Sequence, residues 1–229
     1  MLYYFDWYGM IFMLPFLLFA LWCSYNVKST FQKYSQTRSS RGLTGAKAAQ
    51  ELLQQNGVYD VRIEHISGKL NDHFDPRTKV IRLSDDVYDS TSIAAIGVAC
   101  HEAGHAVQHA TGYTPLKLRN AVIPITNIGS QFGIFGVLIG FLLSADWLVT
   151  ISLVLFFFTV LFQLLTLPTE LNASKRAIQT LESTGMLYGD EVTGARKVLN
   201  AAALTYVAAL ATAIAQFVRV LLYANNRRR

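Results

Sequence analysis

Four long stretches of this sequence are almost free of charged residues, and they limit the possible folds more than any other feature. They cover residues 2–23, 126–144, 147–167 and 198–218, and Asp6 is the only charged residue inside them. A helix of about 20 mainly apolar residues crosses a hydrocarbon core about 30 Å thick. Because 52% of the chain is hydrophobic and only 15% is charged, the sequence predicts a mainly α membrane protein with about four transmembrane helices.

The two central runs are separated only by Ala145 and Asp146, so we expect residues 126–167 to form a tight transmembrane hairpin. The first of these runs has glycines at positions 129, 133, 136 and 140, and G-x-x-x-G spacings are typical of closely packed membrane helices. The run at the start has no basic segment before it and no small-residue cleavage site after it, so residues 1–25 are interpreted as an uncleaved anchor. Residues 198–229 are predicted to form the last membrane helix and a basic tail.

The polar segment between the first two runs, residues 26–125, is predicted to form a small α+β domain. Thr44 is a good N-cap and Asn56-Gly57 a good stop signal, which indicates a short amphipathic helix between them. Residues 61–66 and 79–84 largely alternate apolar and polar side chains, which favours two or three short strands. The strand at 79–83 precedes the next predicted helix, so we expect it to be an edge strand that can pair with an extended peptide.

The most informative motif is H-E-x-x-H, formed by His101, Glu102 and His105. On a helix, residues four apart lie about 40° apart around the axis and about 6 Å apart along it, so the two imidazoles project side by side and can bind one metal ion. Glu102 then lies near the open face of the metal, where a general base for a water molecule is needed. The alternative is an amphipathic helix whose histidines only satisfy hydrogen bonds in the core. Residues available to cap this helix are Ser90, Thr91 and Ser92.

A third ligand is expected shortly after the third apolar run, at Glu170. Catalytic zinc sites usually have three protein ligands, and two histidines with one glutamate are a known set. We expect Pro168 to end the membrane helix and Thr169 to cap a new one, which would place Glu170 in the first turn. The alternative role for Glu170 is a favourable interaction with the dipole of that helix.

The remaining histidines and the cysteines are assigned no catalytic role. His109 lies about 12 Å along the axis from the first histidine of the motif, too far for both to bind one zinc through bonds of about 2.0–2.1 Å. A solvated or substrate-side role is expected for His109, and His65 and His73 are interpreted as surface residues. Cys23 and Cys100 cannot form a disulfide framework, and Cys100 is interpreted as a small buried residue.

Together these residues resemble the membrane-bound gluzincin peptidases, in particular the YugP-type putative neutral zinc metallopeptidases, and are more distantly similar to the HtpX and CAAX-prenyl membrane peptidases. The similarity covers most of the chain, from the anchor through H-E-x-x-H and the hairpin to Glu170-x-x-Ala173 and Ala177. It implies one zinc ion per chain with Glu170 as the third ligand, and peptide-bond hydrolysis with Glu102 as the base. Residues 26–125 would then be the peptidase domain, and residues 168–197 the third-ligand helix and a connector.

This chain departs from the HtpX-like pattern at residue 174, where that pattern has an aspartate that contacts a ligating histidine. Here the residue is Ser174, and either Asn172 or Ser174 is expected to make the equivalent hydrogen bond. Hydrolysis also needs a donor that stabilises the oxyanion. The candidates for this donor are Tyr113, Arg176 and Tyr188.

The metal motif lies close in sequence to the apolar runs, which predicts a site at a membrane surface. We therefore expect a multi-pass protein of the cell membrane that contacts the lipid bilayer and cleaves protein or peptide substrates associated with it, with no role for nucleic acid. The distribution of Lys and Arg places the metal site on the cytoplasmic face. A homo-oligomer or a membrane adaptor is compatible with the sequence. The alternatives are a catalytically inactive zinc-binding scaffold and a site-2-type intramembrane protease, in which H-E-x-x-H would lie inside a membrane span.

Overall fold

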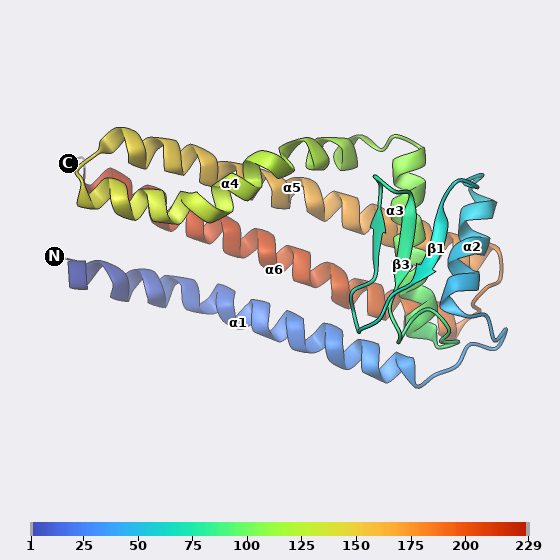
Figure 1. Cartoon of the computed structure of the whole chain (residues 1–229). Coiled ribbons are helices and arrows are strands. Elements are labelled where there is room, and N and C mark those ends of the chain that lie inside the picture. Colours follow the sequence, from blue (N-terminus) through green and yellow to red (C-terminus); the bar gives the residue numbers. More distant parts are fainter. Residues whose placement is uncertain (1, 228–229) are drawn as a thin grey trace. The chain divides into compact units, whose positions relative to one another are not determined.

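The computed structural model describes residues 2–227, which form long helices and one small sheet (Figure 1). Arg228 and Arg229, which belong to the predicted basic tail, lie outside the described residues. The elements in chain order are α1 (Leu2–Ser35), α2 (Gly45–Gln55), β1 (Arg62–His65), β2 (His73–Asp75), β3 (Val80–Leu83), α3 (Ile93–Ala110), α4 (Thr114–Leu142), α5 (Asp146–Ser183) and α6 (Asp190–Arg227).

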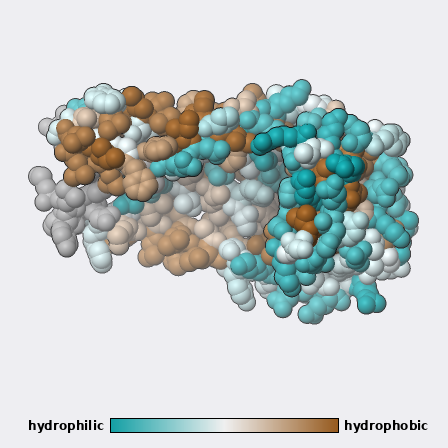
Figure 2. All heavy atoms as spheres, in the orientation of Figure 1, coloured by the Kyte–Doolittle hydropathy of each residue, from teal (hydrophilic) through white to brown (hydrophobic). Residues whose placement is uncertain are grey.

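The chain divides into two compact units. The helical unit consists of Met1–Cys23, Lys117–Pro168 and Thr205–Arg229, and the α+β unit consists of Ser24–Leu116 and Thr169–Leu204. Hydrophobic residues cover much of the surface of the helical unit that is in view, whereas hydrophilic residues dominate that of the α+β unit (Figure 2). This contrast is expected if the first unit is solvated by lipid and the second by water.

Three helical segments among the described residues are long and apolar enough to cross a membrane. They are Trp7–Ser35, Asp146–Ser183 and Asp190–Leu222. They contain the expected runs 147–167 and 198–218 and most of the run 2–23. The remaining run, residues 126–144, falls mostly within α4, and its membrane crossing stays a prediction. α1 continues as a helix to Ser35, so the first part of the polar segment after the anchor is also helical.

The predicted hairpin is formed by α4 and α5, which are joined by a short turn at residues 143–145. The Ala145 N–H closes α4 by donating to the Gly140 carbonyl at 2.8 Å. Glycines of α4 face α5 directly: a Cβ atom at Gly140 would lie 2.7 Å from Val149 Cγ2, and one at Gly133 would lie 3.3 Å from Phe156 Cβ. The G-x-x-x-G spacings therefore do mark a close helix contact.

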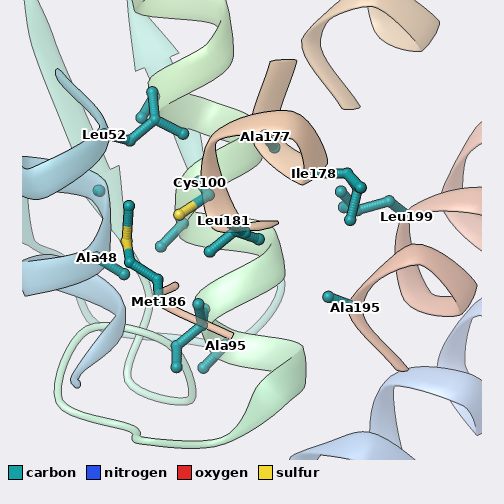
Figure 3. Packing of buried hydrophobic residues seen from close by; sticks show 14 of the residues in the cluster. Ala48, Leu52, Ala95, Cys100, Ala177, Ile178, Leu181, Met186, Ala195 and Leu199 are labelled. Carbon is teal, nitrogen blue, oxygen red and sulfur yellow. The ribbon is translucent and has the colours of Figure 1, made fainter. Parts of the chain in front are cut away.

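The core of the α+β unit lies where α2, α3 and the second half of α5 meet, together with the first turns of α6 (Figure 3). Leu52 of α2, Cys100 of α3 and Leu181 of α5 are fully buried in it. α2 begins at the expected cap, because Thr44 Oγ1 accepts from the Lys47 N–H. α3 begins at Ser92, one of the three candidate caps, whose Oγ accepts from the Ala95 N–H. The small residues of α3 allow neighbouring elements to cover most of its surface.

The three strands form a sheet in the order β1-β3-β2, with β1 parallel and β2 antiparallel to β3. The expectation that residues 79–83 form an edge strand is therefore wrong, because β3 is the central strand. Val80, Ile81 and Leu83 are fully buried, so this strand has both pairing partners and a covered face. The edges of the sheet are β1 and β2, and β2 also contacts α3.

Pro168 does not end a helix, and Thr169 does not begin one, because α5 runs without a break from Asp146 to Ser183. The prediction of a new helix at Thr169 is therefore wrong, and Glu170 lies inside α5. A proline removes one helical hydrogen bond, but packing on both sides can hold the helix together. Phe156 and Val160 are buried before Pro168, and Ala173 and Ala177 after it.

Candidate metal centre

The two histidines of the H-E-x-x-H motif project from α3 and lie next to each other. Their ring centroids are 4.7 Å apart and the rings are nearly perpendicular. Their side chains are only 13% and 12% exposed for His101 and His105, so most of each ring is removed from water. Glu102 lies between them in sequence and is partly exposed.

Glu170 reaches the same point from α5. Its Oε2 atom lies 3.2 Å from Nε2 of His101 and 3.3 Å from Nε2 of His105, and its side chain is 6% exposed. One ligand atom from each of the three residues lies within 4.8 Å of the other two. The structure thus brings together the three residues that the sequence suggested as metal ligands.

A close crossing of α3 and α5 makes this meeting possible. A Cβ atom at Gly104 would lie 2.7 Å from the carbonyl oxygen of Ala173, so the helix backbones are nearly in contact. Ala103 and Gly104 are the two variable positions of the motif, and both are buried. Their small size allows the helix that carries Glu170 to pass directly beside the two histidines.

The donor set fits zinc better than the other common divalent ions. Two imidazoles and one carboxylate match a known catalytic zinc set, in which the fourth position is left for water or substrate. Magnesium and calcium prefer shells made entirely of oxygen atoms. The chemistry of the three side chains therefore indicates a zinc site.

The carboxylates make the site favourable for positive charge. Burial lowers the pKa of His105, but the hydrogen bond to Glu170 and the negative charges of Glu102 and Glu170 together outweigh burial and hold that pKa above its usual value. The same carboxylates would attract a divalent cation to the space between the imidazoles.

Each ligating histidine has a polar partner on its other ring nitrogen. His101 Nδ1 lies 3.0 Å from Ser174 Oγ, so of the two residues expected to make this contact it is Ser174 that does. His105 Nδ1 lies 3.0 Å from Oε1 of Gln108, a residue that sequence reasoning did not single out. Asn172 bonds to Gln108 instead of bonding to a histidine, with its Oδ1 accepting from Gln108 Nε2 at 3.0 Å.

The spacing of Gln108 from His105 was visible in the sequence, but its burial was not. Gln108 is three residues after His105, and residues three apart on a helix are neighbours. It is also a long polar residue in a helix whose other buried residues are small or apolar. A buried glutamine must find hydrogen-bond partners, and a ligating imidazole is one of the few available.

The three candidate oxyanion donors lie in different surroundings. Arg176 Nε donates to Asn172 Oδ1 at 2.9 Å, so its guanidinium is tied to the side chains that surround the ligands. Tyr113 follows α3, and its backbone N–H donates to the Gln108 carbonyl at 2.9 Å. Tyr188 is 60% exposed, and its hydroxyl lies beside Gly185 in the turn before α6.

The remaining histidines are all exposed. His65 pairs with Asp85 at 2.7 Å, and His73 Nδ1 lies 2.8 Å from the Asn71 carbonyl oxygen. His109 packs against Phe74 of β2, with ring centroids 5.8 Å apart. The surface interpretation of these residues agrees with their exposure.

Both cysteines are free and buried. Burial, with a smaller contribution from the charge of Glu51, raises the pKa of the Cys100 thiol. The thiolate is the reactive form of cysteine, so Cys100 is expected to be an inert core residue.

The fold and the site define a class of protein: a helical protein with candidate membrane helices that carries an H-E-x-x-H zinc site completed by a glutamate. The chain belongs to the family described as "Putative neutral zinc metallopeptidase", whose sequence model matches residues 9–225. It is 45% identical over 209 residues to the "Putative membrane protease YugP" of Bacillus subtilis (strain 168), which covers 91% of this chain and 93% of that protein. No solved structure matches the chain.

Proposed function

We propose that this protein is a zinc-dependent endopeptidase that hydrolyses peptide bonds in membrane proteins or in segments next to the membrane. The observation that carries the proposal is the convergence of His101, His105 and Glu170 within 4.8 Å, with a second acidic residue, Glu102, directly after the first histidine. Three residues suffice to hold a catalytic metal. The additional carboxylate is needed only for the reaction.

One zinc ion per chain would be held by His101, His105 and Glu170, and when bound it would supply a Lewis acid that makes water more acidic and polarises the scissile carbonyl. Glu102 has the role of proton carrier. Its carboxylate accepts a proton from the attacking water and later donates the same proton to the amine that leaves. At the end Glu102 is again ionised, and the water has been divided between the two products.

The developing negative charge on the carbonyl oxygen needs a donor, and Arg176 is the candidate best supported by its surroundings. Its tie to Asn172 fixes part of a side chain that would otherwise be mobile, and a preorganised donor stabilises a transition state best. Tyr113 and Tyr188 remain alternatives for this role.

Membrane-associated substrates are proposed because the site is close in sequence to the candidate membrane segments. Glu170 is two residues after Pro168, where the helical unit ends, and α3 ends seven residues before that unit resumes at Lys117. The relative in Bacillus subtilis is also described as a membrane protease. A site-2-type intramembrane protease is less well supported, because α3 is not among the candidate membrane helices of the described residues.

The proposal is tested by measuring metal content and proteolysis on the same purified, full-length protein. Elemental analysis of protein prepared without chelator should give about one zinc per chain, the number expected for one set of three protein ligands. The wild-type chain should cleave an unfolded protein such as casein or a quenched fluorescent peptide library.

The matched control is Glu102→Gln, which keeps the size of the side chain but removes its ability to accept a proton. It should keep zinc and the fold but lose hydrolysis. A wild-type chain without any transition metal would exclude the zinc enzyme. Zinc uptake with no hydrolysis by either protein would support the inactive zinc-binding scaffold instead.

A further inference from the structure

We propose that Gln108 is a positioning residue that fixes which nitrogen of His105 carries the proton, so that the Nε2 lone pair is directed to the metal. This inference rests on the proposed zinc function. Gln108 is fully buried, and its carboxamide has three partners: His105, Thr169 and Asn172. The orientation of this one amide group decides which ring nitrogen of His105 carries the hydrogen.

The amide of Gln108 can point in only one direction without losing hydrogen bonds. Its Nε2 lies 2.8 Å from the Thr169 carbonyl oxygen, which can only accept. The partner atom on Asn172 also accepts a bond from Arg176 Nε, and because an arginine nitrogen can only donate, that atom must be oxygen. Both neighbours therefore require the NH₂ group of Gln108 to face them.

The oxygen of Gln108 then faces His105. Its Oε1 lies 3.0 Å from His105 Nδ1, and because a carbonyl oxygen cannot donate, Nδ1 must carry the hydrogen. The Nε2 lone pair remains free to bind a metal. If the amide were turned, its oxygen would face the Thr169 carbonyl at 2.8 Å, and two buried acceptors would be left in contact without a hydrogen between them.

Ser174 does not impose the same choice on His101. A serine hydroxyl can rotate and either donate or accept, so the 3.0 Å contact between Ser174 Oγ and His101 Nδ1 fits either tautomer. The two histidines are thus held by different means. The tautomer of His105 is fixed through Gln108, whose amide is oriented by the Thr169 carbonyl of α5. Thr169 is next to Glu170, so one short segment of α5 provides the proposed third ligand and also orients the residue that fixes His105.

A purely structural role for Gln108 predicts different behaviour. In that case the amide would only connect α3 to α5, and removing it would lower thermal stability without a specific effect on metal binding. A positioning role predicts that zinc affinity falls more than stability explains. The two roles are distinguished by measuring both zinc affinity and thermal stability in variants that do or do not change the hydrogen bonds of Gln108.

Three variants of the full-length protein in detergent or nanodiscs provide the comparison. Gln108→Leu removes all three hydrogen bonds at similar volume. Gln108→Glu keeps an acceptor for His105 Nδ1 but loses the donors toward Thr169 and Asn172. Val107→Ala shortens the adjacent buried side chain and touches none of these bonds. Zinc Kd is measured by competition with a chromophoric chelator, and Tm by thermal unfolding.

Gln108→Leu should raise the zinc Kd by about 10–100-fold, the usual effect of removing a residue that orients a metal ligand. Val107→Ala should lower Tm but keep the wild-type Kd. Gln108→Glu should lower Tm as well, yet bind zinc more tightly than Gln108→Leu because the carboxylate still orients the imidazole. A wild-type Kd in Gln108→Leu, or equal Kd values for the Leu and Glu variants, would overturn the proposal.

A spectroscopic measurement on the wild type keeps the test valid if Gln108→Leu does not fold. In zinc-loaded protein labelled with ¹⁵N-histidine, His105 should give a slowly exchanging Nδ1–H proton, and its absence would overturn the proposal. A wild-type chain that takes up no zinc contradicts the proposed function itself. Zinc uptake that is unaffected in Gln108→Leu contradicts only the role of Gln108.

Discussion

Gly104 of α3 and Ala173 of α5 lie so close together that a Cβ atom on Gly104 would be 2.7 Å from the Ala173 carbonyl oxygen. This contact is the reason that residues on two helices far apart in sequence can share one metal. His101 and His105 lie on either side of Gly104 along α3, and Glu170 is three residues before Ala173. A larger residue at the crossing would push the glutamate away from the histidines.

We expect Gly104→Ala to weaken both the fold and the metal site. Alanine favours a helix by about 1 kcal/mol relative to glycine, but the added methyl would collide with backbone atoms that cannot turn away. Overpacking of this kind typically costs about 1–3 kcal/mol. Tm and zinc content of the purified protein should both fall.

Gly97→Ala on the same helix is the matched control. A Cβ atom at Gly97 would lie 3.5 Å from Ala195 Cβ, an ordinary van der Waals contact, so this variant should keep its zinc and have an unchanged or slightly higher Tm. If Gly104→Ala behaves like Gly97→Ala, the helices are not held at this distance in solution.

Glu170→Ala should remove zinc from the protein. The carboxylate is the ligand proposed from α5, and two histidines alone would be an incomplete catalytic zinc set. Because bound metal stabilises the folded state by about 2.7 kcal/mol at 100 times its Kd, a chelator should lower the Tm of the wild type and leave that of Glu170→Ala unchanged. Full zinc occupancy in this variant would mean that the third ligand lies elsewhere.

Ser174 should influence zinc affinity through His101. Ser174→Ala removes the partner of His101 Nδ1 and should weaken zinc binding by about tenfold, the lower end of the usual range for such contacts. Ser174→Asp should strengthen binding, since a carboxylate makes the imidazole a better donor to the metal. Competition with a chelator measures both effects.

The control for Ser174 is Ser183→Ala, near the end of the same helix. The hydroxyl of Ser183 bonds only to the Thr180 carbonyl among the described contacts, so its loss should leave zinc affinity unchanged. Equal affinities in all of these variants would show that His101 does not depend on the residue at position 174.

The metal helix and its two histidines were predictable from sequence because their signals are local. A cap among residues 90–92 and the i, i+4 spacing of the histidines need no knowledge of tertiary structure, although the choice of Ser92 comes from the structure. Glu170 was found in a different way, from the chemical need for a third ligand. No local rule connects it to His101, from which it is separated by 69 residues.

The features that could not be predicted from the sequence depend on tertiary packing. Pro168 was expected to end a helix, but buried residues on both sides keep α5 continuous. β3 was expected at an edge, but β1 and β2 pair with its two sides, and strand order depends on contacts between segments far apart in the sequence. Gln108 was overlooked because a single glutamine on a helix is usually solvated, and only the crossing of α5 buries it.

The side of the membrane that carries the site is the last prediction. If the chain crosses four times, residues 24–125 and 168–197 share one side, and the turn between α4 and α5 lies on the other. Ten basic residues near the membrane are on the site side: Lys28, Lys33, Arg38, Arg41, Lys117, Arg119, Lys175, Arg176, Arg196 and Lys197. The opposite side has Arg219 near the end of the last span and the arginines at 227–229. Positive residues concentrate in the cytoplasm, so the site should face the cytoplasm.

Cysteine labelling in intact cells tests this orientation. Ser39 lies on the site side but is only 6% exposed, so the exposed Ser67 in the loop between β1 and β2 is the better position. The background is Cys23→Ala and Cys100→Ala, which removes both native thiols. Leu143→Cys is the matched position for the opposite side, because Leu143 is 70% exposed in the turn after α4.

With a membrane-impermeant thiol reagent, Leu143→Cys should react in intact cells, whereas Ser67→Cys should react only after permeabilisation. The reverse pattern would place the metal site outside the cytoplasm. Reaction of both in intact cells would put the two positions on the same side, which is incompatible with a crossing by α4. Because the two cysteines are separated by one predicted span, residues 126–144 of α4, the experiment tests the sidedness of the site and the crossing by α4 together.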